Sequence, residues 1–179
     1  MIDIEKCCLV VVDVQGKLAE LMDGKESLFA NIEVLIKAAK ALEMPILCCR
    51  QNPRALGPTV PQLAELLDGV EPVDKMSFSC CGDAKFIEKL NALKATDVIL
   101  CGIEAHVCIY QTAMDLLDRD LNVHLIADAV SSRTAANRQI AVRRLTAEGA
   151  NLSSTEMILF ELLKTAEHPE FKELCRLIK

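Results

Sequence analysis

The chain has 179 residues, 51% hydrophobic and 26% charged, a balance typical of a single folded domain spanning residues 1–179. Its formal net charge of −6 disfavours nucleic acid or an anionic membrane as a partner. No apolar run approaches the length needed to cross a bilayer, and the N-terminus lacks the basic and long apolar regions of a signal peptide. We therefore expect a cytoplasmic protein.

Short apolar runs alternate along the chain with stretches of helical periodicity. The strand-like runs are Cys7–Val12, Pro45–Cys49, Val98–Cys101 and Val123–Ala127, with weaker ones near Val70–Asp74 and Ala150–Ser153. The helical stretches are Ser27–Leu42, Asp83–Leu93 with Asp83 as N-cap, Val107–Leu117, Thr134–Ala147 closed by Gly149, Glu156–Leu163 and Pro169–Ile178. This alternation predicts an α/β fold in which helices cover both faces of a parallel sheet of about six strands.

One long loop is expected at Gln51–Pro61, which holds three prolines and Gly57 and follows a strand. Loops at that position line the ligand crevice of open α/β sheets. The loop therefore marks the edge of the sheet at which to look for a site.

Three residues at this edge can carry chemistry. Asp13 ends the first apolar run, Lys75 follows the weak third strand, and Cys108 begins a helix a few residues after the fourth. A thiol in a first helical turn experiences the positive end of the helix dipole, which lowers its pKa, and the free amides there can hold an oxyanion. Structural roles remain open for each: Cys108 as a packing residue, Asp13 as a cap of the next turn, and Lys75 as a solvated surface group.

Other reactive side chains give weaker signals. His106, two residues before Cys108, could serve as a catalytic base or line a pocket, whereas His124 and His168 are better explained as structural. No His/Asp cluster has metal-ligand spacing and no phosphate-binding glycine motif is present, so neither a metal nor another cofactor is predicted. The nine cysteines include no C-x-x-C, and most are expected to be small buried hydrophobes, the exceptions being Cys108 and one of Cys80 or Cys81.

Taken together, these segments resemble the isochorismatase-like cysteine hydrolase family, whose members include nicotinamidase, N-carbamoylsarcosine amidohydrolase and isochorismatase. The resemblance runs from about residue 7 to residue 160 and keeps the order Asp13, Lys75, Cys108. It is most specific over Gly102–Ala113, and nearest to the poorly characterised isochorismatase-domain-containing hydrolases. It is carried by Leu9–Gln15, Lys75 with Phe78-Ser79, Cys101–Cys108 with Gln111-Thr112-Ala113, Asp128-Ala129, Leu56–Pro61, Ser131-Ser132-Arg133 and His168–Lys172.

The resemblance implies a three-layer α/β/α fold with a six-stranded parallel sheet ordered 3-2-1-4-5-6. It implies that Asp13 takes the thiol proton of Cys108 while Lys75 stabilises the charged pair. Amides near Ala105 and Cys108 would hold the oxyanion, with a non-proline cis peptide at Glu104-Ala105. The residues expected to bind a small-molecule substrate are Gln15, Leu18, Asn52, Leu56, Cys80, His106 and Tyr110, with Met22 also shaping the pocket. A homo-oligomer is expected on the same basis.

Two departures narrow the reaction. The metal-binding histidines of nicotinamidases have no counterpart here, and Cys108 stands where isochorismatase itself lacks the cysteine. We therefore expect a metal-independent hydrolase that cleaves a C–N bond of a small amide, carbamoyl or related compound through a thioester-type intermediate. Two alternatives remain: a thiol redox-responsive protein, suggested by the nine cysteines, and a non-catalytic oligomeric binding module on the same fold.

Overall fold

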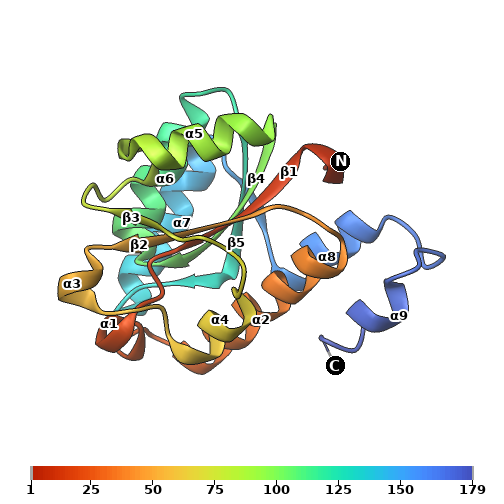
Figure 1. The fold of residues 1–179 in the computed structure, drawn as a ribbon, viewed down its shortest axis with the longest axis horizontal. Helices are drawn as coiled ribbons and strands as arrows, with labels where there is room; N and C mark the ends of the chain where they lie inside the picture. Colours follow the sequence, from red (N-terminus) through yellow and green to blue (C-terminus); the bar gives the residue numbers. More distant parts are fainter. Residues whose placement is uncertain (1, 179) are drawn as a thin grey trace.

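The computed structural model describes residues 2–178, which form a three-layer α/β/α arrangement around a six-stranded sheet (Figure 1). The strands pair in parallel in the order β3-β2-β1-β4-β5-β6. This confirms the predicted fold class and sheet order. The strands are β1 Cys7–Val12, β2 Ile46–Gln51, β3 Val73–Lys75, β4 Asp97–Ile103, β5 Asn122–Ser131 and β6 Asn151–Ser153.

The longer helices lie close to their predicted ranges, whereas the one expected at Pro169–Ile178 is only the single turn Phe171–Leu174. The predicted cap at Asp83 forms, and Thr134 provides a cap that was not predicted. The Asp83 side chain accepts the amides of Lys85 and Phe86, and the Thr134 hydroxyl accepts the amide of Asn137. No helix within residues 2–178 combines the length and apolar character that a membrane crossing requires. The helices are α1 Gly16–Glu20, α2 Lys25–Ala41, α3 Pro53–Leu56, α4 Pro61–Leu66, α5 Ala84–Leu93, α6 Tyr110–Leu117, α7 Ala135–Ala147, α8 Thr155–Leu163 and α9 Phe171–Leu174; shorter turns are η1 Ile4–Lys6, η2 Cys80–Gly82 and η3 Ala105–Ile109.

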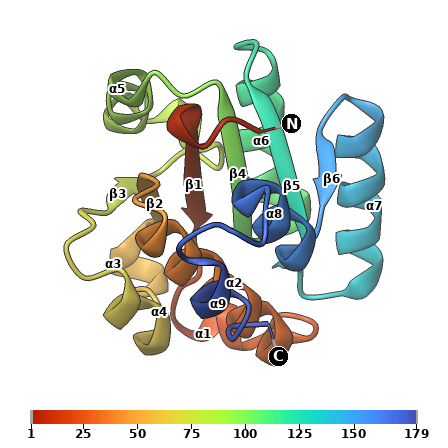
Figure 2. The same cartoon turned by 90° about the vertical axis from the view of Figure 1, so that its right-hand side faces the viewer.

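The strands are apolar on both sides because each side faces a helical layer. Successive strand residues point to opposite faces. Leu9 and Val11 of β1 accordingly pack in the cluster that includes residues of α2, α4 and α8, whereas Val10 and Val12 pack with residues of α5, α6 and α7. Figure 2 shows the sheet between these layers, with α7 beyond the β6 edge. Because both layers are filled, chemistry is confined to the ends of the strands.

The segment expected to be one long loop, Gln51–Pro61, is more structured than predicted. It contains the end of β2, the single-turn helix α3 and the start of α4, and both helices have a proline in their first turn. Proline fits there because the first helical N–H groups have no partner in the helix. Treating proline only as a breaker hides these two helices in the sequence, and the five-residue helix α1 is also not predicted.

Candidate active site

Asp13 is the residue directly after β1, and its backbone takes the left-handed conformation, with φ of 55°. Its N–H donates to the Cys49 carbonyl at 3.0 Å, which ties it to the end of β2. Only 2% of the residue is exposed. A non-glycine residue with positive φ is uncommon. Here it places a carboxylate beneath the edge of the sheet instead of in solvent.

Lys75 ends β3, two strands away from β1, yet its side chain reaches inward to Asp13. The Nζ atom lies 2.6 Å from Asp13 Oδ2, and the lysine is only 1% exposed. The ammonium also donates to Gln51 Oε1 at 2.8 Å and to the Phe78 carbonyl at 3.0 Å. With several acceptors around it, Nζ is held as a cation.

The second oxygen of the Asp13 carboxylate has no such partner. Among the described residues, Asp13 Oδ1 is the one buried side-chain polar atom without a well-formed hydrogen bond. The Cys108 thiol is close enough to this carboxyl to act on its pKa as a hydrogen-bonding neighbour. Asp13, Lys75 and Cys108, separated by up to 95 positions in the sequence, thus meet in one buried cluster. A carboxylate that neighbours a thiol and has one oxygen without a hydrogen bond is suited to accept the thiol proton.

Burial controls the ionisation of the cluster. Desolvation raises the pKa of Cys108 far above its ordinary value, and the Asp13 charge raises it further, against the influence of Lys75. Desolvation likewise raises the pKa of Asp13 although Lys75 opposes it. Desolvation lowers the pKa of Lys75, but Asp13, Cys80 and Cys108 together outweigh it, and the pKa of Lys75 is raised. The lowered thiol pKa expected from the helix dipole is therefore wrong: the resting group is a thiol, and it needs a neighbouring base.

The turn that leads to Cys108 differs from expectation by one residue. The non-proline cis peptide lies at Ile103-Glu104 and not at Glu104-Ala105. The reason is that β4 continues through Ile103 and η3, a π-helical turn, begins at Ala105, which leaves Glu104 as the only connecting residue. The Glu104 carbonyl accepts the amides of Val107 and Ile109, whereas the Ala105 amide donates to none of the described residues. That free amide is available to an oxyanion.

The Glu104 side chain is directed away from this turn. Its Oε2 accepts the Arg133 backbone N–H at 3.1 Å and the Arg133 Nε at 3.2 Å. His106 is also held by the protein, with Nδ1 3.0 Å from the Ser132 hydroxyl and Nε2 3.4 Å from Asn137 Nδ2. Because one ring nitrogen contacts the segment before α7 and the other contacts α7 itself, His106 is poorly placed to serve as a general base.

The residues expected to bind substrate are spread around this edge in different roles. Gln15 is fully buried, and its amide is consumed by backbone groups of Gln51 and Gly57. Cys80 is buried in η2, where its N–H donates to the Thr112 hydroxyl. Tyr110 starts α6 and lies under the Arg144 guanidinium, 4.7 Å from its ring centroid. Met22 is buried, and three residues are partly exposed: Leu18, Asn52 and Leu56.

Sequence reasoning missed two residues that shape the site. Gln51 falls within the expected loop Gln51–Pro61, but it is the last residue of β2 and lies at the same edge of the sheet as Asp13, which follows β1. Gly102, directly opposite Val12 in the β1–β4 pairing, has φ of 121°, and a Cβ there would lie 2.1 Å from the Val12 carbonyl oxygen. The carboxyl-edge rule could have found Gln51, whereas the role of Gly102 depends on the distance between two strands.

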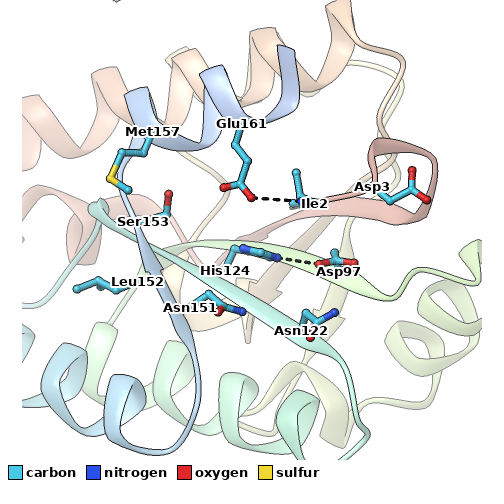
Figure 3. A pocket seen from close by; sticks show the side chains of 10 residues that line it. All are labelled: Ile2, Asp3, Asp97, Asn122, His124, Asn151, Leu152, Ser153, Met157 and Glu161. Carbon is cyan, nitrogen blue, oxygen red and sulfur yellow. Dashed lines mark hydrogen bonds and ion pairs between the residues drawn. The ribbon is translucent and has the colours of Figure 1, made fainter. Parts of the chain in front are cut away.

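A hollow at the opposite edge of the sheet is separate from this cluster. A cavity of about 460 Å³ lies where β4 and β5 begin, and the His124–Asp97 pair, 2.8 Å apart, contributes to its wall (Figure 3). Burial raises the pKa of Asp97, but its hydrogen bonds with His124, Thr96 and Asn122 outweigh that desolvation and leave the pKa lowered. The predicted structural role of His124 agrees with this contact, and Cys108 does not line this cavity.

The fold and the arrangement of its edge define a class of protein. The model of the isochorismatase domain matches residues 7–157, and the chain belongs to the isochorismatase family, with the fold of its hydrolases. It is similar to isochorismatase domain-containing protein 2 of Homo sapiens, 43% identical over 171 residues that cover 96% of this chain and 82% of that protein. The rat protein of the same name is 39% identical over 176 residues, covering 98% of this chain and 82% of the relative.

Solved structures give the same picture. A structure described as the MAR1 ribonuclease of Caenorhabditis elegans is 40% identical, with a TM-score of 0.92 over 99% of this chain and 91% of that one. The YcaC gene product of Escherichia coli, described as an octameric hydrolase of unknown specificity, has a TM-score of 0.88 over 98% of this chain and 94% of its own. At 19% identity, the second comparison shows the fold alone.

Proposed function

We propose that this chain is a metal-independent cysteine hydrolase that cleaves a C–N bond of a small amide or carbamoyl compound. One observation carries the proposal: the Cys108 thiol neighbours the buried Asp13 carboxylate, of which Lys75 occupies one oxygen and leaves the other without a well-formed hydrogen bond. Such an arrangement gives a base next to a nucleophile and a fixed cation that keeps the base ionised. The 6% exposure of Cys108 favours a small substrate.

The proposed reaction has two halves. Asp13 Oδ1 takes the proton of the Cys108 thiol as the sulfur attacks the substrate carbonyl carbon, and the carbonyl oxygen becomes an oxyanion at the Ala105 amide. Collapse of this adduct breaks the C–N bond, and the departing nitrogen takes the proton from Asp13. Water then attacks the thioester as Asp13 accepts its proton, and the returned proton restores the thiol as the acid leaves. Lys75 keeps its charge throughout.

Alkylation of Cys108 by iodoacetamide against pH tests the central step. An ordinary thiol reacts only as pH approaches about 8.5, whereas base assistance by Asp13 should allow reaction at about pH 6. Asp13→Asn should abolish that reaction at the lower pH, and Cys108→Ser identifies the labelled site. A native Cys108 that reacts with the pH profile of a free thiol would end the proposal. A screen over amides, ureides and carbamates with the same variants then identifies the substrate.

Cleavage of RNA is a second candidate because a basic segment includes α7, the helix that contacts η3. Residues 129–147 contain four arginines and no acidic residue, although the whole chain carries −6. They are Arg133, Arg138, Arg143 and Arg144, and α7 contacts η3, which carries Cys108. The relative from Caenorhabditis elegans is described as a ribonuclease. Degradation of single-stranded RNA by the native protein and not by Cys108→Ser would favour this activity over amide hydrolysis.

The redox alternative is less well supported by the surroundings of the thiols. Eight of the nine cysteines are buried, and the ninth, Cys175, is partly exposed. Burial raises the pKa of the Cys8 thiol to about 12 and that of Cys48 and Cys81 to about 11, which disfavours the reactive thiolate. Mild peroxide followed by mass spectrometry tests this alternative, which requires a reversible sulfenic acid or disulfide.

We also propose that the chain forms a homo-oligomer. Met157 and Phe160 lie one turn apart on α8, and with Leu152 of β6 they are exposed apolar side chains. Burial of this surface between copies would remove it from water. Size-exclusion chromatography with light scattering measures the assembly, and a monomer at micromolar concentration contradicts it.

A further inference from the structure

The Gln51 side chain is fixed at both of its polar atoms, although the residue is only half-buried. It ends β2 directly beside Lys75 in the β2–β3 register. Its Oε1 accepts a hydrogen bond from Lys75 Nζ at 2.8 Å, and its Nε2 donates to the Met76 carbonyl at 2.9 Å. In a surface glutamine whose side chain rotates freely, neither of these atoms would have a fixed hydrogen-bond partner.

The backbone of Gln51 is fixed as well, by the side chain of Gln15. The Gln51 N–H donates to Gln15 Oε1 at 2.7 Å, and Gln15 Nε2 donates to the carbonyls of Gln51 and Gly57 at 3.1 and 2.7 Å. Gln15 itself is fully buried after β1. A continuous series of contacts therefore runs from Gln15 through Gln51 to Lys75 and Asp13.

The ammonium of Lys75 has three hydrogens to place. The three shortest contacts are to Asp13 Oδ2, Gln51 Oε1 and the Phe78 carbonyl, and the Ser77 carbonyl lies farther away at 3.3 Å. Gln51 supplies the only neutral side-chain acceptor of this set, from the strand that lies between β3 and β1. Without it, a buried ammonium loses one hydrogen bond and the fixed direction of its approach to Asp13.

We propose that Gln51 is a positioning residue, one that fixes the Lys75 ammonium on Asp13 Oδ2 and thereby keeps Oδ1 free for the proton of Cys108. The inference rests on the proposed function for its catalytic consequence. Its structural part, the anchoring of the Lys75 ammonium, stands on the hydrogen bonds alone.

The test is Gln51→Met, which keeps the length of the side chain and removes the strong acceptor. Gln62→Met, the same change at an exposed position of α4, is the matched control. The first readout is the ¹⁵N NMR signal of Lys75 Nζ with its protected hydrogens, assigned by its absence from Lys75→Met. The second is the alkylation rate of Cys108 at about pH 6. We expect Gln51→Met to fold, to lose the protected signal and to be alkylated about tenfold more slowly, as loss of a hydrogen bond to a charged group predicts. Gln62→Met should change neither.

The results of these measurements distinguish the anchoring of Lys75 by Gln51 from the proposed function of Cys108. An unchanged Lys75 signal and alkylation profile in Gln51→Met would overturn the positioning role, as would an equal effect of Gln62→Met. If native Cys108 reacts as an ordinary thiol, the proposed function fails, and loss of the Lys75 signal in Gln51→Met still supports the anchoring role. Should Gln51→Met not fold, Gln51→Glu retains an oxygen acceptor for Lys75, and absence of the protected signal from that folded variant also overturns the role.

Discussion

Replacing Lys75 by Met is expected to destabilise the protein by an amount that grows with pH. Asp13 is only 2% exposed, and its Oδ1 already lacks a well-formed hydrogen bond. The change also removes the contact of Oδ2 with Lys75 Nζ at 2.6 Å. Breaking a buried ion pair in this way costs about 3–5 kcal/mol when the remaining charge stays ionised. Protonation of Asp13 relieves most of that cost, and the pKa of Asp13, already raised by burial, rises further without Lys75.

The direction of this pH dependence follows from the raised pKa of Asp13 in the folded state. The folded state holds the Asp13 proton more tightly than the unfolded chain, so stability is greatest below the ordinary value of 3.8 and is lost as pH rises from there toward the folded-state pKa. Urea unfolding of native protein and Lys75→Met at about pH 5 and about pH 8 should therefore show a larger difference at the higher pH. The double variant Lys75→Met with Asp13→Asn has no charge at either of these positions and should recover much of the lost free energy of unfolding. A pH-independent difference, or a double variant as unstable as the single one, would refute this account.

Three further expectations follow from individual contacts. Hydrolysis should rise with pH as Asp13 loses its proton, at a midpoint above 3.8, and should not fall until Lys75 deprotonates above 10.5; a rise that follows a free thiol in a pH–rate profile contradicts this. Gly102→Ala should cost at least about 3 kcal/mol in urea unfolding, because the new Cβ meets the Val12 backbone; a near-neutral change would show that the strands can separate at no cost. Asp83→Ala should lower the free energy of unfolding by about 1 kcal/mol through loss of the α5 cap while leaving catalysis unchanged, and an altered turnover would be inconsistent with a purely local cap.

The sequence predicted the fold because its signals are local and repeated. Each of the six strands and the longer helices has its own apolar pattern, and Asp83 and Thr134 have the side chains that cap helices. The short helices α1, α3 and α4 escaped detection because four to six residues carry too little periodicity, and because proline marks both a break and a helix start.

For the site, the sequence determined which residues lie at the carboxyl edge of the sheet, since Asp13 and Cys108 follow strands and Lys75 ends one. Tertiary structure alone decided their chemistry. Whether the Cys108 pKa falls with the helix dipole or rises with burial depends on how much water reaches the sulfur, and desolvation prevails. The free oxygen of Asp13 and the amide of Gln51 on Lys75 depend on the packing of three strands, and no pattern along one segment encodes a distance between segments.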